Sequence, residues 1–357
     1  MEQKMRRRKT IGLLLIIGLL LVILAGCRTE EGAAAVPEPP AVTPAEAPLE
    51  QPLVEQEPES PKPDLAEIKA NEAGKVMILM YHVIGGEKEK DWAQTADNFR
   101  RDLLTLYNEG YALLDINDFV NNTIKVAAGR TPVVLTFDDG TPGHFRYLEK
   151  EDGSVEIDPD CAVGILLDFE RQHPDFGRAA VFYINDAPFG QRKYIREKLQ
   201  EMVDLGFTLG NHTLTHPKLN QLGDERVQKE LALLAQQVEE AVSGYRVETL
   251  ALPFGISPQN RALLAAGTWE GYTYRNLGVL KVGANPAHSP NHVNYDALTL
   301  PRVQASTVEL EKWLEYFRKH PEERYISDGD PETVAVPQDR QELLNKDTLA
   351  GKELLVY

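Results

Sequence analysis

The chain has 357 residues, of which 42% are hydrophobic, and its 55 acidic and 38 basic side chains give a formal net charge of -17 at pH 7. This surplus of negative charge argues against nucleic acid as a partner, because phosphate binding needs clustered Lys and Arg. The two cysteines, Cys27 and Cys161, exclude a disulfide framework, so a hydrophobic core must hold the fold.

Residues 1–27 have the pattern of an export signal. A basic run between Lys4 and Lys9 precedes an apolar run over 11–25, and such a segment is left out of the fold. The ending Leu24-Ala-Gly-Cys27 resembles a bacterial lipobox, which implies cleavage before Cys27 and lipidation of its thiol. The alternative is an uncleaved anchor, because the apolar run is only slightly shorter than a membrane span. We therefore expect an extracytoplasmic protein that is lipid-anchored to the cell membrane.

Residues 28–73 are expected to form a disordered tether between the anchor and the domain. The segment 28–64 is rich in Pro, Ala and Glu and holds nine of the 23 prolines. Such a composition cannot bury enough apolar surface to fold, and proline keeps the chain extended.

A single domain is predicted over residues 74–320. Amphipathic helices are expected over 98–108 and 224–243, and a last helix near Ser306. Alternation of strands with helices predicts an α/β fold with a parallel sheet. The strand-like runs are 76–80, 112–116, 133–137, 179–184, 207–209 and 249–252.

Two polar motifs follow strands of this predicted sheet. Asp138 and Asp139 end the run 133–137, and neighbouring acids at a strand end diverge, so that one can hold a metal while the other handles a proton. His212 and His216 follow a later strand and are four residues apart. Two imidazoles and one carboxylate are a typical set of ligands for zinc with open positions. Solvated turn acids and capping histidines are the alternative.

The order Thr136-Phe-Asp-Asp-Gly140, His212-Thr-Leu-Thr-His216 and Leu252-Pro-Phe-Gly255 resembles the NodB-like polysaccharide deacetylases, carbohydrate esterase family 4. The resemblance covers roughly residues 74 to 320. It implies a distorted, incomplete (β/α) barrel whose site lies at the C-terminal ends of the strands. Leu79-Met-Tyr-His82 is similar to the subgroup acting on poly-N-acetylglucosamine, in which an N-terminal Tyr-His supplies the catalytic acid.

The resemblance also implies the roles of the site residues. Asp138 would be the base and His82 the acid, and the backbone N–H of Phe254 would stabilise the oxyanion. The metal would be zinc, with cobalt, nickel or manganese fitting the same ligands. The implied metal ligands are Asp139, His212 and His216.

Two departures from the family pattern stand out. Many members have an Arg that pairs with the catalytic Asp, whereas this chain has Ala251 at the matching position. Arg302 is a candidate to supply that charge, and an ordinary surface Arg is the alternative. The segment 141–178 is longer than usual in the family. Its acidic run over 152–160 favours a solvated hairpin over a calcium loop, since it lacks EF-hand spacing.

The sequence after Gly271 is less informative. His288 and His292 repeat the four-residue spacing in a polar loop, where a structural role is favoured over a second metal site. Residues 321–357 are polar and acidic and are treated as a C-terminal extension, whose order the sequence does not decide.

We expect a monomeric, metal-dependent hydrolase that removes N-acetyl groups from N-acetylglucosamine-containing polysaccharide, either peptidoglycan or an exopolysaccharide. One alternative is an O-acetyl esterase on xylan or another glycan, which would use the same residues. The other is a glycan-binding lipoprotein without turnover. The presence of Asp138 argues against this reading, because a binding module has no use for a base.

Overall fold

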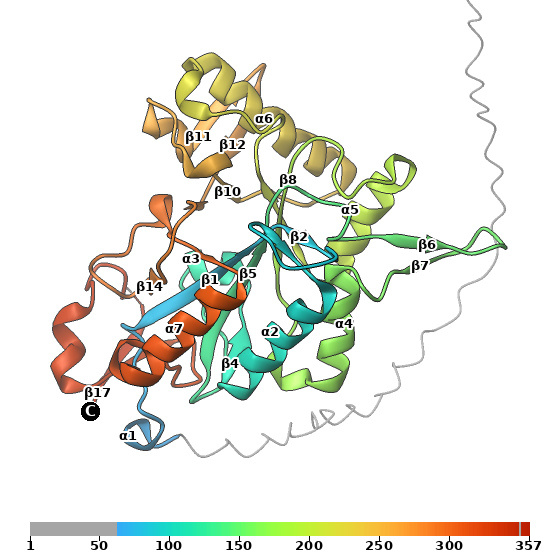
Figure 1. Ribbon diagram of the computed structural model, residues 1–357. Coiled ribbons are helices and arrows are strands. Elements are labelled where there is room, and N and C mark those ends of the chain that lie inside the picture. Colours follow the sequence, from blue (N-terminus) through green and yellow to red (C-terminus); the bar gives the residue numbers. More distant parts are fainter. Residues whose placement is uncertain (1–62, 350) are drawn as a thin grey trace, which may run out of the picture. The chain divides into compact units, whose positions relative to one another are not determined.

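The computed structural model describes residues 63–349 and 351–357, which belong to one compact unit (Figure 1). The predicted signal peptide, residues 1–27, and most of the predicted tether lie outside the described residues, so lipid anchorage through Cys27 stays a prediction. Among the described helices, none is long and apolar enough to cross a membrane.

A curled sheet of mostly parallel strands forms the centre of the fold, as the alternating pattern predicts. Its order is β13-β10-β9-β8-β5-β1-β14, with β4 beside β5 and β15 beside β1, and β14 is the antiparallel member. The sheet is an incomplete barrel. Its strands are β1 (Lys75–Tyr81), β4 (Tyr111–Leu113), β5 (Thr131–Phe137), β8 (Val181–Ile184), β9 (Thr208–Asn211), β10 (Thr249–Ala251), β13 (Gly278–Leu280), β14 (Ala287–His288) and β15 (Val303–Gln304).

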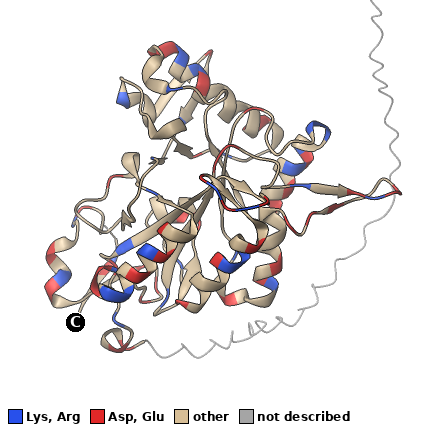
Figure 2. Cartoon of the chain, in the orientation of Figure 1, with Lys and Arg blue, Asp and Glu red and all other residues tan. Residues whose placement is uncertain are grey.

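Five amphipathic helices cover the outer face of this sheet (Figure 1). Thr95 caps the first of them through the N–H of Asn98, and Ser306 caps the last through the N–H of Glu309. Acidic and basic residues are interspersed along their solvent sides (Figure 2). The helices are α2 (Ala96–Asn108), α4 (Ala162–Gln172), α5 (Ile195–Asp204), α6 (Asp224–Ala241) and α7 (Thr307–Lys319).

The two faces of the sheet bury separate clusters, because side chains alternate along each strand. Met77 of β1 and Leu135 of β5 face the outer helices, whereas Ile78 and Val134 face the interior of the barrel. The short helix α3 (Ile116–Val120) closes this interior. The predicted strand 112–116 was therefore too long, because Asp115 caps α3 through the N–H of Asn117.

The segment 141–178 contains the predicted hairpin and one of the outer helices. The hairpin pairs β6 (Tyr147–Glu149) with β7 (Val155–Ile157). Two acids of the run 152–160 pair with cations at the surface: Glu156 with Lys150 (2.6 Å) and Asp160 with Arg100 (2.6 Å). The run thus contains the predicted hairpin strand and two acids in surface ion pairs.

The remaining short elements are found in loops and at the chain ends. The pair β2 (Val83–Ile84) and β3 (Ala93–Gln94) follows β1, and β11 (Ala266–Trp269) pairs with β12 (Tyr272–Arg275). The parallel pair β16 (Thr333–Val336) and β17 (Glu353–Val356) lies in the C-terminal extension.

Both segments that flank the predicted domain pack onto it. Residues 63–73, which were assigned to the disordered tether, include α1 (Leu65–Ile68) and the buried Glu72. Glu72 accepts hydrogen bonds from the Tyr325 hydroxyl and the Ala335 N–H, both at 3.0 Å. Tyr325 is itself part of the interior cluster. The ordered domain therefore begins before residue 74 and includes residues after 320.

Candidate active site

The site lies where the carboxyl ends of neighbouring parallel strands meet. His82 directly follows β1, Asp138 follows β5, and His212 follows β9, so the topology alone brings three distant segments together. The side chains line one cavity of about 420 Å³. Its lining includes His82, Asp138, Asp139, His212, His216 and Phe254.

Asp139, His212 and His216 present three ligand atoms that lie within 4.8 Å of one another. Oδ1 of Asp139 is 3.3 Å from Nε2 of His212 and 3.4 Å from Nε2 of His216. Ligand bonds of about 2.0–2.1 Å at a tetrahedral angle leave their donor atoms about 3.3 Å apart. These three residues therefore fit a small divalent metal such as zinc.

The protonation of His212 suits a metal ligand. Its Nδ1 lies 2.8 Å from the carbonyl oxygen of Ala251. A carbonyl can only accept, so Nδ1 carries a proton, which leaves Nε2 as the nitrogen that can bind a metal beside Asp139. Contacts of this kind fix the orientation of ligating histidines in metal sites.

A side chain that follows the neighbouring strand β8 holds the loop that carries His212 and His216. Asn185, directly after β8, donates through Nδ2 to the carbonyls of His212 (2.7 Å) and Thr213 (2.9 Å). The Thr213 hydroxyl in turn accepts from the N–H of His216 at 3.0 Å. The spacing of the two ligands is thus set by Asn185 from outside the motif and by Thr213 within it.

Asp138 and Arg302 form a buried, bidentate ion pair. Nη1 and Nη2 of Arg302 lie 2.7 and 2.6 Å from the two carboxylate oxygens, and both side chains are at most 1% exposed. Burial alone would raise the pKa of Asp138, but the guanidinium holds it well below its usual range. Asp138 is therefore an ionised carboxylate near the candidate metal ligands.

Arg302 supplies the positive charge beside Asp138 that Ala251 cannot supply. Ala251 is fully buried, and its carbonyl supports His212, so the strand position that carries Arg in many relatives has no charge here. Arg302 reaches Asp138 from the segment before β15 and is oriented by the carbonyl of Lys281 (2.9 Å) and by Thr136 (3.0 Å).

His82 also lies close to Asp138. Its Nε2 is 3.9 Å from Oδ2 of Asp138, and its ring packs against Trp92 with centroids 4.8 Å apart. Burial lowers the pKa of His82, although the charges of Asp138 and Asp139 act in the opposite direction. The His82 carbonyl accepts a hydrogen bond from the fully buried His144 ring, which positions this backbone.

The sequence reading did not single out Trp92, His144 or Asn185. Each lies in a loop without a periodic pattern, and each acts on a residue from another strand. No local spacing signals such a contact.

Left-handed backbone conformations are concentrated at this site. Such conformations are uncommon outside glycine and cluster where structure is constrained by function. Five non-glycine residues of the site have positive φ, namely Trp92 (64°), Asp139 (74°), Thr213 (66°), His216 (55°) and Phe254 (58°).

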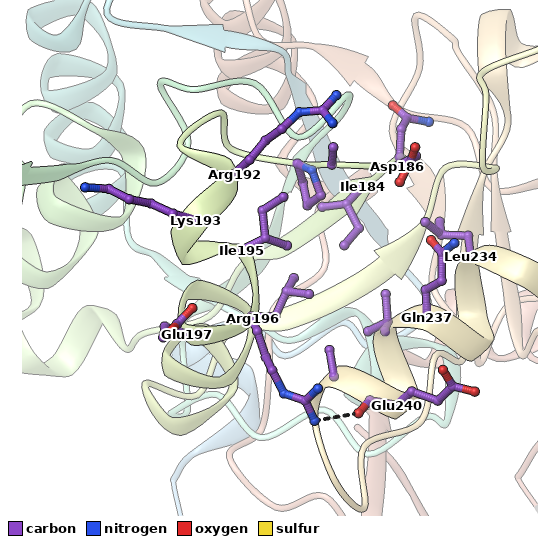
Figure 3. Close-up of a pocket in the computed structure, with 16 residues that line it drawn as sticks. Ile184, Asp186, Arg192, Lys193, Ile195, Arg196, Glu197, Leu234, Gln237 and Glu240 are labelled. Carbon is purple, nitrogen blue, oxygen red and sulfur yellow. Dashed lines mark hydrogen bonds between the residues drawn. The ribbon is translucent and has the colours of Figure 1, made fainter.

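A second hollow, of about 660 Å³, lies between α5 and α6 (Figure 3). Its lining mixes aliphatic residues, such as Ile195 and Leu234, with charged ones, and Arg196 donates to the carbonyl of Glu240 at 3.0 Å. It contains none of the candidate metal ligands. The chemistry therefore belongs to the smaller cavity.

The second histidine pair has a structural arrangement. The rings of His288 and His292 stack with centroids 4.1 Å apart, and Nδ1 of His292 accepts from the N–H of Asn294 at 3.0 Å. Among the described residues, only Asp139, His212 and His216 form a group of three possible metal ligands.

Comparison with known proteins supports the second and third of the three motifs. The family model for polysaccharide deacetylases matches residues 175–274, which include His212, His216 and Phe254. This part of the chain is therefore similar to polysaccharide deacetylases. The protein YxkH of Bacillus subtilis (strain 168) is 22% identical over 242 residues, which are 64% of this chain and 77% of YxkH.

Two solved structures are similar to this chain over about two thirds of its length. The Streptococcus pyogenes deacetylase PplD in complex with acetate is 17% identical, with a TM-score of 0.49 over 68% of this chain and 97% of PplD. BC0361, a polysaccharide deacetylase from Bacillus cereus, is 22% identical, with a TM-score of 0.48 over 67% of this chain and 68% of its own.

Proposed function

We propose that the protein is a metal-dependent hydrolase that removes N-acetyl groups from polysaccharide containing N-acetylglucosamine, either peptidoglycan or an exopolysaccharide. One observation carries this proposal. A set of three possible metal ligands, an ionised carboxylate and a histidine from three separate strands converge on one cavity.

Asp139, His212 and His216 are the residues that would hold the metal. A divalent metal, when bound, would polarise the acetyl carbonyl and activate a water molecule. Asp138 is held ionised by Arg302 and can accept the proton of the attacking water. We assign oxyanion stabilisation to the N–H of Phe254, whose residue lines the cavity beside His216.

His82 is the residue to which we assign protonation of the leaving amine. Like His212, it lies close to Asp138, since Nε2 of each histidine is 3.9 Å from Oδ2 of Asp138. His82 is not one of the three candidate metal ligands, so it can donate to the nitrogen while the carbonyl faces those ligands. The products are acetate and a glycan with a free amine.

The substrate class is supported by the family match, because polysaccharide deacetylases act on acetylated polysaccharides. An O-acetyl ester on xylan or another glycan could be cleaved by the same groups. The substrate that releases acetate distinguishes the two activities.

Acetate release from defined substrates tests the proposal. We expect the purified protein, without its signal peptide, to release acetate from N-acetylglucosamine oligomers or peptidoglycan. The activity should be lost on chelation and return with zinc. Asp138→Asn should lose turnover, because an amide cannot accept the proton, while retaining its metal, which elemental analysis measures.

The comparison variant is Asp139→Asn, which removes a candidate ligand and should lose metal and activity together. Acetate from acetylated xylan alone would replace the deacetylase by an esterase. A folded, metal-loaded protein that is inactive on every substrate would favour a glycan-binding function. Full activity of Asp138→Asn would remove Asp138 as the base.

A further inference from the structure

The cavity has an apolar rim around its polar centre. Three of the eight exposed large hydrophobic residues of the described chain line it, namely Val83 (39% exposed), Trp92 (44%) and Phe254 (52%). Exposed apolar surface gathered at a cavity indicates a binding surface, whereas isolated exposed residues are ordinary.

The two aromatic residues lie at opposite ends of the row of polar groups. Trp92 packs on His82 with ring centroids 4.8 Å apart, and Phe254 packs on His216 with centroids 4.6 Å apart. Asp138 and Asp139 lie between these two histidines. A ligand that reaches from one aromatic ring to the other therefore passes over the reacting groups.

Trp92 occupies a turn position that favours glycine. The N–H of Ala93 donates to the carbonyl of Lys90 at 3.1 Å, so Trp92 is the third residue of a tight turn, and its φ is 64°. Glycine or asparagine is normal at this position when φ is positive. A bulky aromatic residue here is a backbone outlier, and such strain persists mainly where the side chain has a function.

We propose that Trp92 is a sugar-binding platform, on which a pyranose ring of the substrate stacks beside His82. The inference rests on the proposed function, because it places the sugar next to the acid. A flat aromatic face offers large apolar area to the C–H face of a sugar ring, and the Asp138–Arg302 pair and Asp139 supply the polar centre. The ligand class is a neutral N-acetylhexosamine oligosaccharide.

Binding without turnover tests this role. In an Asp138→Asn background, we would measure the Kd of an N-acetylglucosamine pentamer by calorimetry, with and without Trp92→Gly. We expect Trp92→Gly to weaken binding about tenfold, as for the loss of one good aromatic contact. The melting temperature should stay equal or rise, because glycine relieves the positive φ. If Trp92 served only in packing, Trp92→Gly would lower the melting temperature.

The matched control is Glu270→Gly, which also places glycine at a positive φ (44°), in the β11–β12 turn. It should leave the Kd unchanged. Trp92→Leu keeps an apolar side chain but removes the ring face, so it decides the question if the glycine variant folds poorly. Binding of Trp92→Leu equal to that of its parent would overturn the platform.

The outcomes separate this inference from the proposed function. Pentamer binding that requires Trp92, in a protein that releases no acetate from any substrate, would support the platform and reject the deacetylase. Acetate release together with Kd values unaffected by both Trp92 variants would reject the platform alone.

Discussion

At the scale of single residues, the Asp138–Arg302 pair decides the charge at the site. Two buried side chains with two short hydrogen bonds between them form a strong contact, and removing one partner leaves the other charge unpaired. The carboxylate is therefore ionised over the whole range in which the protein is expected to work.

Arg302→Met should shift the pH profile of the reaction. Without the guanidinium, burial dominates and the pKa of Asp138 rises, by about 1–3 units from the lost charge alone. The acid limb of kcat/KM should move to higher pH by a comparable amount. Acetate release between about pH 3 and about pH 7.5 measures it, a range that extends about one unit beyond the ordinary pKa values of Asp and His. Arg171→Met, at an exposed surface pair, is the control. An unmoved limb would exclude Arg302 as the residue that tunes the base.

At the scale of elements, the site depends on loops that follow neighbouring strands. The loop after β9 carries both candidate histidine ligands, and Asn185 after β8 fastens it by two hydrogen bonds to backbone carbonyls. Since β8 and β9 pair in register, with Ile184 opposite Asn211, the support and the ligands are adjacent by topology.

Asn185→Ala should weaken metal binding without unfolding the protein. The loss of the two donors loosens the backbone of His212 and Thr213, and contacts of this supporting kind typically contribute 10–100-fold to metal affinity, so we expect about that loss. Zinc affinity by competition with a chelating dye measures it. Gln200→Ala, which removes an exposed contact on α5, should have no effect. Equal affinities in the two variants would contradict the role of Asn185.

At the scale of the molecule, the chain ends complete the barrel. Glu72 and Tyr325 join the two ends through a buried hydrogen bond between residues 253 positions apart. Burial raises the pKa of Glu72 from 4.5 to about 8, with the nearby Asp328 charge acting in the same direction.

The stability of the protein should therefore fall as the pH rises through this range. The folded protein binds the Glu72 proton more tightly than the unfolded chain, so its contribution is complete below about pH 4.5 and is lost as the pH approaches about 8. Urea unfolding at several pH values measures this loss. It should be smaller in Glu72→Gln, which does not titrate, and unchanged in the control Glu67→Gln at an exposed helix position. Parallel pH curves for Glu72→Gln and the parent would contradict it.

The sequence by itself determined the parallel α/β framework, because its strand runs and helix caps are local patterns of period two and 3.6. It also predicted the Asp and His motifs at strand ends, whose meeting follows from parallel pairing. The boundaries were less accurate: Glu72 was assigned to the tether, and the strand run over 112–116 extends into α3.

Only the tertiary structure decided which distant residues complete the site. Arg302 meets Asp138 across 164 positions, and Ala251 supports His212 through a backbone carbonyl that any residue type would present. Trp92 lines the cavity from a turn with positive φ, and the sequence of that turn does not show which way the Trp92 side chain points. Contacts of this kind depend on how the strands curl and the loops fold back. They leave no periodic trace in the chain, and they appear only once the barrel is assembled.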